Sequence, residues 1–317
     1  MNALTATNYF LKDQIHFFRG KVRDVYSLKN DIVVIVTCDR ISAFDHVLPV
    51  SIPNKGQILN ELANISLDAT SEIIPNWKIS QPDPHVTIGK KANAIPVEFV
   101  VRKHLTGHAW RVYKEGGRVL CGVKLPNGMQ ENEAFETPII TPSTKASSGK
   151  DEDISLKEIL DSKLLTTSQV DKLVDVSLRL FKKGTEFANS KGLILVDTKY
   201  EFGKRNGKMI LIDEVHTPDS SRYFYIDRYQ ELLAQNKPQK QLSKEFVREW
   251  LMENGFQGLK GQVVPEMTPD IIEHIVTRYS ELYRALSGKK LVRRSYANII
   301  EELENNINTG IEAINYE

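Results

Sequence analysis

The chain has 317 residues, of which 41% are hydrophobic and 26% charged, as is typical of a globular protein with one large or two associated domains. Its 42 Lys and Arg residues nearly balance its 41 Asp and Glu residues, and a formal charge of +1 argues against a nucleic-acid partner. No apolar run approaches the length of a membrane span, and the N-terminus lacks the charged-then-apolar order of a signal peptide, so we expect a cytoplasmic protein with no membrane partner.

The two cysteines, Cys38 and Cys121, form no cluster with metal-binding spacing. Free thiols in a reducing cytosol are the expected state. A single disulfide or a reactive thiol is the alternative.

The first predicted elements are a strand over residues 16–28, a turn at Asn30-Asp31 and a second apolar strand. Within the first strand Lys21 and Arg23 share a face beside Gly20. A glycine next to two basic residues lets the backbone approach an anion, although the spacing is not that of a Walker motif. The alternative is an exposed basic edge strand that prevents aggregation.

A polar loop follows the second strand, and it is a reasonable place for a small polar ligand. It contains Asp39, Arg40, Ser42 and Asp45. The same residues are also typical of an ordinary capped loop, because Asp and Ser satisfy backbone amides. Apolar residues at helical spacing then predict an amphipathic helix over residues 55–67.

A third strand is predicted near residues 95–102, with Glu98 and Arg102 on one face. At the strand end, Arg102 could bind a phosphate or carboxylate with two hydrogen bonds. His108, in the turn that follows, could donate to the same anion or be an ordinary surface histidine.

Periodicity is lost over residues 126–153, which predicts a functional lid or a mobile surface loop. The clearest helix covers residues 167–190 and ends before Gly192. Three further helices are expected, starting near Ser243, at Thr268 and near Ser295.

Residues 192–222 predict a β-hairpin with an Asn206-Gly207 turn. Asp197, Lys199 and Glu201 alternate onto one face of its first strand, and Asp213 ends the second apolar run. Carboxylates on adjacent strands with a lysine between them suit a divalent cation that carries phosphates. A solvated sheet face with cross-strand ion pairs is the alternative.

The register of this hairpin sets a condition on the metal site. A two-residue turn pairs Glu201 with Ile212, so Asp213 would point away from Glu201. A shared metal therefore requires an odd-length loop, a bulge, or a position of Asp213 past the end of the strand.

Taken together, these motifs resemble the SAICAR synthetase family of de novo purine synthesis, in its longer branch. The resemblance extends from about residue 17 to 291 and rests on IPVEFVVRKHLTG from Ile95, LVDTKYEFG from Leu195, GKVRDVY from Gly20, DRISAFD from Asp39, PNKGQILN from Pro53, TPSTKA from Thr141 and DEVHTPDSSR from Asp213.

The resemblance implies an ATP-dependent ligase. It would condense carboxyaminoimidazole ribonucleotide (CAIR) with L-aspartate to give the succinocarboxamide ribonucleotide (SAICAR), ADP and phosphate, through an acyl phosphate. The implied fold is a two-lobed α+β structure with ATP between the lobes. A kinase-like antiparallel lobe would cover residues 1–103, and a larger lobe with the metal and ribonucleotide sites would cover residues 104–317, in a monomer or homodimer.

The resemblance also implies roles for individual residues. Lys21 and Arg23, with Gly20, would hold the ATP phosphates, and Glu98 would lie on the strand beside the adenine. Glu201 and Asp213 would bind Mg²⁺.

In the same way, Lys199 would contact a phosphate or the reacting carboxylate, and Asp197 would orient the ribonucleotide or bind a second metal. Arg102 and Arg222 would bind the ribonucleotide phosphate. The candidates for the aspartate substrate are Asp39, Arg40 and Ser42.

Two positions depart from the family pattern. His108 stands where a serine is common, and Lys150 where the lid commonly has a histidine. His108 can still donate a hydrogen bond, with a different reach and pH dependence. Neither change affects the carboxylates, so the expected activity is kept. A small-molecule kinase and a non-catalytic nucleotide-binding module are the alternatives.

Overall fold

The computed structural model describes residues 3–145 and 151–314. The predicted single strand over residues 16–28 is wrong, because the chain reverses at Gly20, whose amide donates to the Arg23 carbonyl oxygen at 2.8 Å. The segment therefore forms two strands, β1 (Gln14–Arg19) and β2 (Arg23–Leu28). The predicted turn at Asn30 and Asp31 is confirmed, with φ of 60° and 56°.

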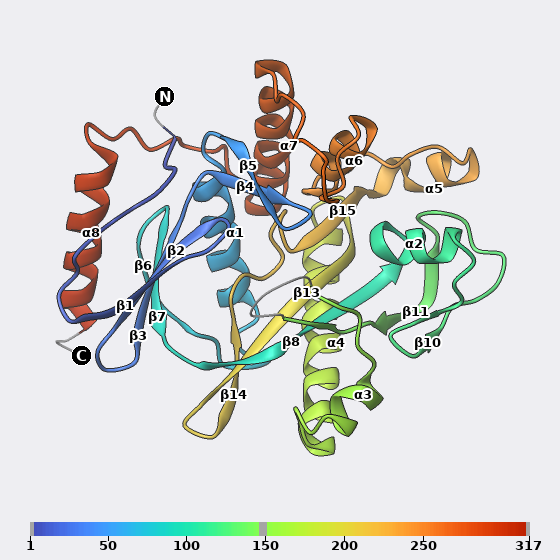
Figure 1. The fold of residues 1–317 in the computed structure, drawn as a ribbon, viewed down its shortest axis with the longest axis horizontal. Helices are drawn as coiled ribbons and strands as arrows, with labels where there is room; N and C mark the ends of the chain where they lie inside the picture. The colour runs from blue at the N-terminus through green and yellow to red at the C-terminus, as the bar shows by residue number, and fades with distance from the viewer. Residues whose placement is uncertain (1–2, 146–150, 315–317) are drawn as a thin grey trace.

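The first sheet is antiparallel and has the order β1-β2-β3-β7-β6. Its other strands are β3 (Ile32–Thr37), β7 (Val86–Lys90) and β6 (Lys78–Asp83). The helix α1 (Lys55–Ala69) packs on one face and α8 (Ile299–Ile314) on the other (Figure 1). Val34 and Val36 pack in the cluster of α8, while Val33 packs in the cluster of α1. Burial on both faces explains the unbroken apolar run of β3.

The second sheet is built on two long strands, β8 (Asn93–His104) and β13 (Leu193–Arg205), which pair antiparallel along most of their length. Its order is β11-β8-β13-β14, with β12 also on β8 and β15 also on β13. These strands are β11 (Ala134–Ile140), β12 (Ser143–Thr144), β14 (Lys208–Ile212) and β15 (Ser221–Tyr225). Residues 126–153 were expected to be irregular. This is wrong for β11 and β12, which pair with β8 along the edge that β13 leaves open.

The helix α4 (Thr167–Asn189) packs against the second sheet, and its first turn is closed by a capping box of Thr166 and Gln169. The helix α7 (Pro269–Ser287) starts after Thr268 and stops at Gly288, as predicted, and Gly288 has φ of 69°. The remaining elements are β4 (Arg40–Ala43), β5 (His46–Ser51), α2 (Gly107–Lys114), β9 (Val119–Leu120), β10 (Val123–Lys124), α3 (Leu156–Asp161), α5 (Ile226–Ala234) and α6 (Glu245–Glu253).

The fold is α+β with two lobes, each built on one sheet. The expected boundary at residue 103 falls at the end of β8, which pairs with β13 and so belongs to the second sheet. The C-terminal helix α8 packs on the first sheet through Leu303, Ile307 and Ile311. If each lobe is defined by its sheet, the first lobe ends before Asn93 and also includes α8.

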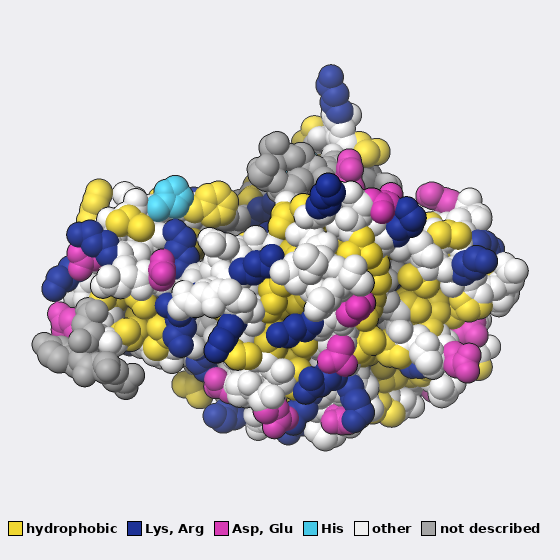
Figure 2. Space-filling view, turned by 90° about the horizontal axis from the view of Figure 1, so that it is seen from below, with side chains coloured by type: hydrophobic (Ala, Val, Ile, Leu, Met, Phe, Trp, Pro, Cys, Tyr) yellow, Lys and Arg dark blue, Asp and Glu magenta, His cyan; other side chains and the backbone are white. Residues whose placement is uncertain are grey.

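The surface and the helices agree with the composition. Figure 2 shows basic and acidic side chains interspersed over one face of the molecule, without a field of a single sign. Within the described residues, no helix combines the length and hydropathy that a membrane span requires. Cys38 and Cys121 are both free thiols, as predicted.

Candidate active site

The central hairpin has the register that the sequence predicts. Asn206 and Gly207 form its two-residue turn with φ of 50° and 73°, and Glu201 pairs with Ile212. Asp213 follows the last residue of β14 and has φ of 61°. Of the three ways in which Asp213 could reach Glu201, the structure uses a position past the end of the strand.

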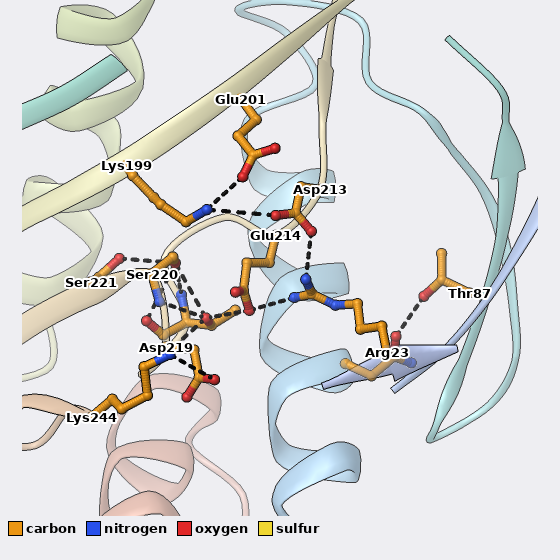
Figure 3. Close-up of polar contacts among 12 residues, drawn as sticks. Arg23, Thr87, Lys199, Glu201, Asp213, Glu214, Asp219, Ser220, Ser221 and Lys244 are labelled. Atoms are coloured by element: carbon orange, nitrogen blue, oxygen red, sulfur yellow. Dashed lines mark hydrogen bonds and ion pairs between the residues drawn. The ribbon is translucent and has the colours of Figure 1, made fainter. Parts of the chain in front are cut away.

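The left-handed backbone of Asp213 turns its carboxylate back toward the face of Glu201 (Figure 3). The Lys199 Nζ atom lies 2.5 Å from Glu201 Oε1 and 3.8 Å from Asp213 Oδ2. The structure therefore brings Asp213, Glu201 and Lys199 together around one ammonium group.

Two more side chains complete this cluster. Glu98 lies directly opposite Glu201 on β8, and its Oε1 accepts from Lys199 Nζ at 2.8 Å. Lys145, next to β12, donates to Glu201 Oε2. Two directly opposed carboxylates repel each other, and the two lysines compensate that repulsion. Glu98, expected beside the adenine, thus faces the carboxylate cluster.

The electrostatics of the cluster keep its groups charged. Burial acts to lower the pKa of Lys199, but Glu201, Glu98 and Asp213 together raise it well above its usual value. Burial acts to raise the pKa of Glu201, but Lys199 and Lys145 hold it below its usual value. These carboxylates therefore favour the charged form of Lys199.

Arg23 connects this cluster to the first sheet. Its Nη1 atom lies 2.6 Å from Asp213 Oδ1 and its Nη2 atom 2.7 Å from Glu214 Oε2. Burial acts to lower the pKa of Arg23, but Asp213 and Glu214 raise it. Arg23, which the sequence predicts to bind a phosphate, thus holds the Asp213 carboxylate from the first sheet.

The carboxylates suit Mg²⁺ only together with a phosphate ligand. Among the described residues, no three His, Cys, Asp or Glu side chains converge as a metal cage. Mg²⁺ is usually bound by one or two carboxylates, several waters and the phosphates of a substrate. Glu201 and Asp213 fit this second arrangement.

A cavity of about 480 Å³ opens beside the cluster. Its lining includes Lys199, Asp197 and Arg222 from β13 and β15, and Arg102 and His108 from β8 and α2. This volume is in the range of sites for small molecules. Five of the residues singled out in the sequence therefore meet in one cleft.

Asp197 lies between two arginines in the wall of the cavity. It is opposite Arg102 on β8 and opposite Arg222 on β15. Its Oδ2 atom accepts from Arg102 Nη1 at 3.1 Å and from Arg222 Nη1 at 2.7 Å. The carboxylate orients both guanidinium groups, and Arg222 Nη2 is held in turn by Glu245 at 2.6 Å.

One polar atom of Arg222 is not satisfied by the described residues. Its Nε atom is buried and has no hydrogen-bond partner in the part of the chain that the structure describes. Gly107 makes room for this side chain, since a Cβ there would lie 2.3 Å from Arg222 Nη2. His108 lines the same cavity with 43% of its side chain exposed, and its Nε2 atom contacts Asp153 at 2.7 Å.

The sequence reasoning missed a second buried charge network. Asp219 accepts from Lys55 Nζ at 2.9 Å and from the Tyr279 hydroxyl at 2.6 Å, and Lys244 Nζ lies 3.5 Å away. Burial lowers the pKa of Lys244 to about 8, although Asp219 acts in the opposite direction. Asp219 lies inside the DEVHTPDSSR motif, which was its only signal in the sequence.

The structure does not bring Asp39, Arg40 and Ser42 into the cavity. The Asp39 carboxylate is buried and accepts from the amides of Leu4 and Gly56 at 2.9 and 2.8 Å. Arg40 donates to the carbonyl oxygen of Gly20 at 3.0 Å and so holds the N-terminal turn. Asp39 and Arg40 thus bind backbone groups, and none of the three residues lines the cavity.

The turn after β4 lines the cavity with Phe44 and Asp45 instead. Lys21 makes an exposed ion pair with Asp45. Lys150 lies outside the described residues.

The sequence matches known proteins along nearly its whole length. A family model described as SAICAR synthetase matches residues 16–263. The phosphoribosylaminoimidazole-succinocarboxamide synthase of Bacteroides thetaiotaomicron is 57% identical, over 97% of this chain and 98% of that protein. The enzyme of the same name from Flavobacterium psychrophilum is 50% identical, over 97% and 98%.

Solved structures agree with these relatives. SAICAR synthase from Saccharomyces cerevisiae, solved in complex with SAICAR, superposes with a TM-score of 0.74 at 32% identity, over 88% of this chain and 96% of that chain. A SAICAR synthetase solved in complex with ADP superposes with a TM-score of 0.68 over 88% and 100% of the two chains, and at 21% identity it supports the fold alone.

Proposed function

The chain belongs to the SAICAR synthetase family, and we propose that its cleft joins CAIR to L-aspartate in a reaction driven by ATP. The products are SAICAR, ADP and phosphate, a step of de novo purine synthesis. The observation that carries this proposal is the arrangement of side chains on one face of β13. Lys199 lies between Asp197, which holds two arginines, and the Glu201 carboxylate. Successive residues on one strand face are about 7 Å apart, so one strand can place three reactants in a row.

The reaction needs activation because a carboxylate is a poor acylating agent. An oxygen of the CAIR carboxylate attacks the γ-phosphorus of ATP, the bond to the β–γ bridging oxygen breaks, and ADP leaves. The aspartate amine then attacks the carbonyl carbon of the acyl phosphate, loses a proton and expels phosphate. Such chemistry depends mainly on positioning and on neutralising charge.

The ribonucleotide phosphate is assigned to Arg102 and Arg222. Both guanidinium groups are oriented by Asp197, and both arginines line the cavity. An oriented guanidinium group gives up little conformational freedom when it binds a phosphate. His108 would add a donor at the rim of the same cleft.

Lys199 is assigned to the reacting carboxylate and the γ-phosphoryl group. Its raised pKa keeps it protonated, so it stabilises negative charge. Glu201 and Asp213 would hold Mg²⁺ when MgATP binds, and that ion neutralises the phosphate oxygens. Arg23 and the turn at Gly20 and Lys21 would hold the phosphates from the first lobe, which places ATP between the two sheets.

The aspartate substrate needs cations other than the two arginines in the wall. Lys244 and Arg248 line the same cavity. Because Asp39, Arg40 and Ser42 lie outside the cavity, we assign the two aspartate carboxylates to Lys244 and Arg248.

The test is an assay with MgATP and CAIR, with and without L-aspartate, that follows ADP and the succinocarboxamide product. We expect SAICAR and one ADP per turnover only when all three substrates are present. The absence of product with all three substrates would refute the proposal. ADP and a stable phosphorylated product without aspartate would indicate a kinase, and ATP binding without turnover a nucleotide-binding module.

A further inference from the structure

The backbone of Asp213 is held by a tryptophan of the other lobe. The indole Nε1 of Trp77 donates to the Asp213 carbonyl oxygen at 3.0 Å. Trp77 precedes β6 of the first sheet, and only 6% of its surface is exposed. A buried hydrogen bond from Trp77 thus holds the main chain of Asp213, whose conformation brings its carboxylate near Lys199.

The segment around Trp77 also pairs with the end of β14. The Leu211 amide donates to the Pro75 carbonyl oxygen at 2.9 Å, and the Trp77 amide donates to the Leu211 carbonyl oxygen at 3.1 Å. Residues 75–77 therefore lie alongside β14 and pair with it in parallel at Asn76 and Leu211. The backbone on both sides of Ile212 is fixed by the same segment.

Gly89 of β7 fixes where the indole lies. A Cβ at this position would lie 2.3 Å from Trp77 Cε3 and 2.3 Å from the Trp77 carbonyl oxygen. The ring therefore packs directly on the glycine backbone, and a larger residue would displace it. This close approach explains a glycine inside a strand, where glycine is otherwise unfavourable.

The conformation of Asp213 needs such support. A continued strand would turn its side chain to the face opposite Glu201. The observed φ of 61° is less favourable for aspartate than for glycine, so contacts of its main chain and side chain help to maintain it. Trp77 holds the main chain and Arg23 holds the carboxylate at 2.6 Å.

We propose that Trp77 is a positioning residue that keeps Asp213 in its left-handed conformation and thereby sets the affinity of the cleft for a metal–nucleotide complex. The inference rests on the proposed role of Asp213 as a magnesium ligand. In this proposal Trp77 acts through its hydrogen bond to the carbonyl oxygen of Asp213.

The experiment is calorimetric titration of the full-length protein with a non-hydrolysable ATP analogue, with and without Mg²⁺. Its readout is the factor by which Mg²⁺ increases the affinity for the analogue. Trp77→Phe keeps an aromatic ring and removes the donor. We expect this substitution to reduce the Mg²⁺ factor roughly 3- to 10-fold, the range for one lost hydrogen bond, and to leave binding without metal unchanged.

Two further variants separate a positioning role from general damage. Gly89→Ala should displace the ring and reduce the same factor, whereas Trp250→Phe, on α6 and partly buried in the core, should leave it unchanged. An equal loss of affinity with and without Mg²⁺ in Trp77→Phe would overturn the inference, because that pattern indicates a purely structural role.

Asp213→Asn tests the underlying assignment. We expect it to abolish the Mg²⁺ factor. If it does so while Trp77→Phe keeps the full factor, the role of Trp77 is refuted and the metal site stands. If Asp213→Asn itself keeps the full factor, the metal role of Asp213 fails, and the inference about Trp77 fails with it.

Discussion

Glu98 and Glu201 lie directly opposite each other on β8 and β13, and their carboxylates share the ammonium group of Lys199. A directly opposed pair of like charges destabilises a sheet unless a counter-charge lies between them. The same lysine contacts Asp213 at 3.8 Å. One side chain therefore stabilises the sheet and supplies the fixed positive charge of the proposed reaction.

Replacing this lysine should affect stability and turnover together. We expect Lys199→Gln to lower kcat by about 100-fold or more, because a charge-stabilising donor is lost. It should lower the free energy of unfolding by about 2 kcal/mol. This is less than the loss for a fully buried ion pair, because 27% of the Lys199 side chain is exposed. Steady-state kinetics and urea unfolding measure the two effects.

The double variant Lys199→Gln with Glu98→Gln separates them. Removing one of the opposed carboxylates should restore most of the stability and none of the turnover. Recovery of turnover in the double variant would show that Lys199 acts only within the fold.

Neutralising either proposed metal ligand should remove activity while the fold remains. We expect Glu201→Gln and Asp213→Asn each to lower turnover by orders of magnitude, because charge neutralisation is the main catalytic contribution. Circular dichroism checks the fold, and Glu231→Gln, exposed on α5, is the matched control. Unchanged turnover in either variant would remove that residue from the metal site.

Two glycines with similar backbones give a test of the ribonucleotide site. Gly107 and Gly192 have φ of 56° and 74°, so an alanine at either position should cost about 1 kcal/mol of stability. Only at Gly107 would the added Cβ meet Arg222, at 2.3 Å, because nothing described lies within 4 Å of one at Gly192.

We therefore expect Gly107→Ala to raise the KM for CAIR by about 10-fold or more, through the displaced guanidinium group, with little change in the KM for ATP. Gly192→Ala should leave both constants unchanged. An equal effect of the two substitutions on the KM for CAIR would contradict the assignment of Arg222 to the phosphate.

A partly buried carboxylate on α6, Glu249, should make the stability depend on pH. Burial, and then repulsion from Glu245, raises the pKa of Glu249 from 4.5 to about 7. The folded protein therefore keeps this proton between pH 4.5 and 7, where the unfolded chain has lost it. The stabilisation is complete below pH 4.5 and is lost as the pH rises through 7.

Glu249→Gln stays neutral at every pH, so it avoids this loss. We expect the free energy of unfolding of the variant, measured relative to that of the parent protein, to be about 2–3 kcal/mol higher at pH 8 than at pH 4.5. Urea unfolding at the two pH values measures this change, and Glu253→Gln, exposed on the same helix, is the control. A stability difference that does not change between pH 4.5 and pH 8 would refute the shift.

Local patterns were enough to predict the elements around the site. The Asn206-Gly207 turn defines the hairpin register by itself, since both residues tolerate positive φ. The alternation along β13 places Asp197, Lys199 and Glu201 on one face for the same local reason. The strand over residues 16–28 was wrong because the reversal at Gly20 depends on Arg40, whose guanidinium group holds the turn from another strand.

The sequence by itself determined the family, the hairpin register and the charged face of β13, because motif spacing and strand alternation need no distant contact. Only the tertiary structure decided that Asp213 reaches Lys199, since its left-handed backbone is held by Trp77 and Arg23 from the other lobe. It also placed Asp39 and Arg40 on backbone partners outside the cavity. A polar residue in a sequence is compatible with a ligand or a backbone partner, and only the packing of distant segments selects between them.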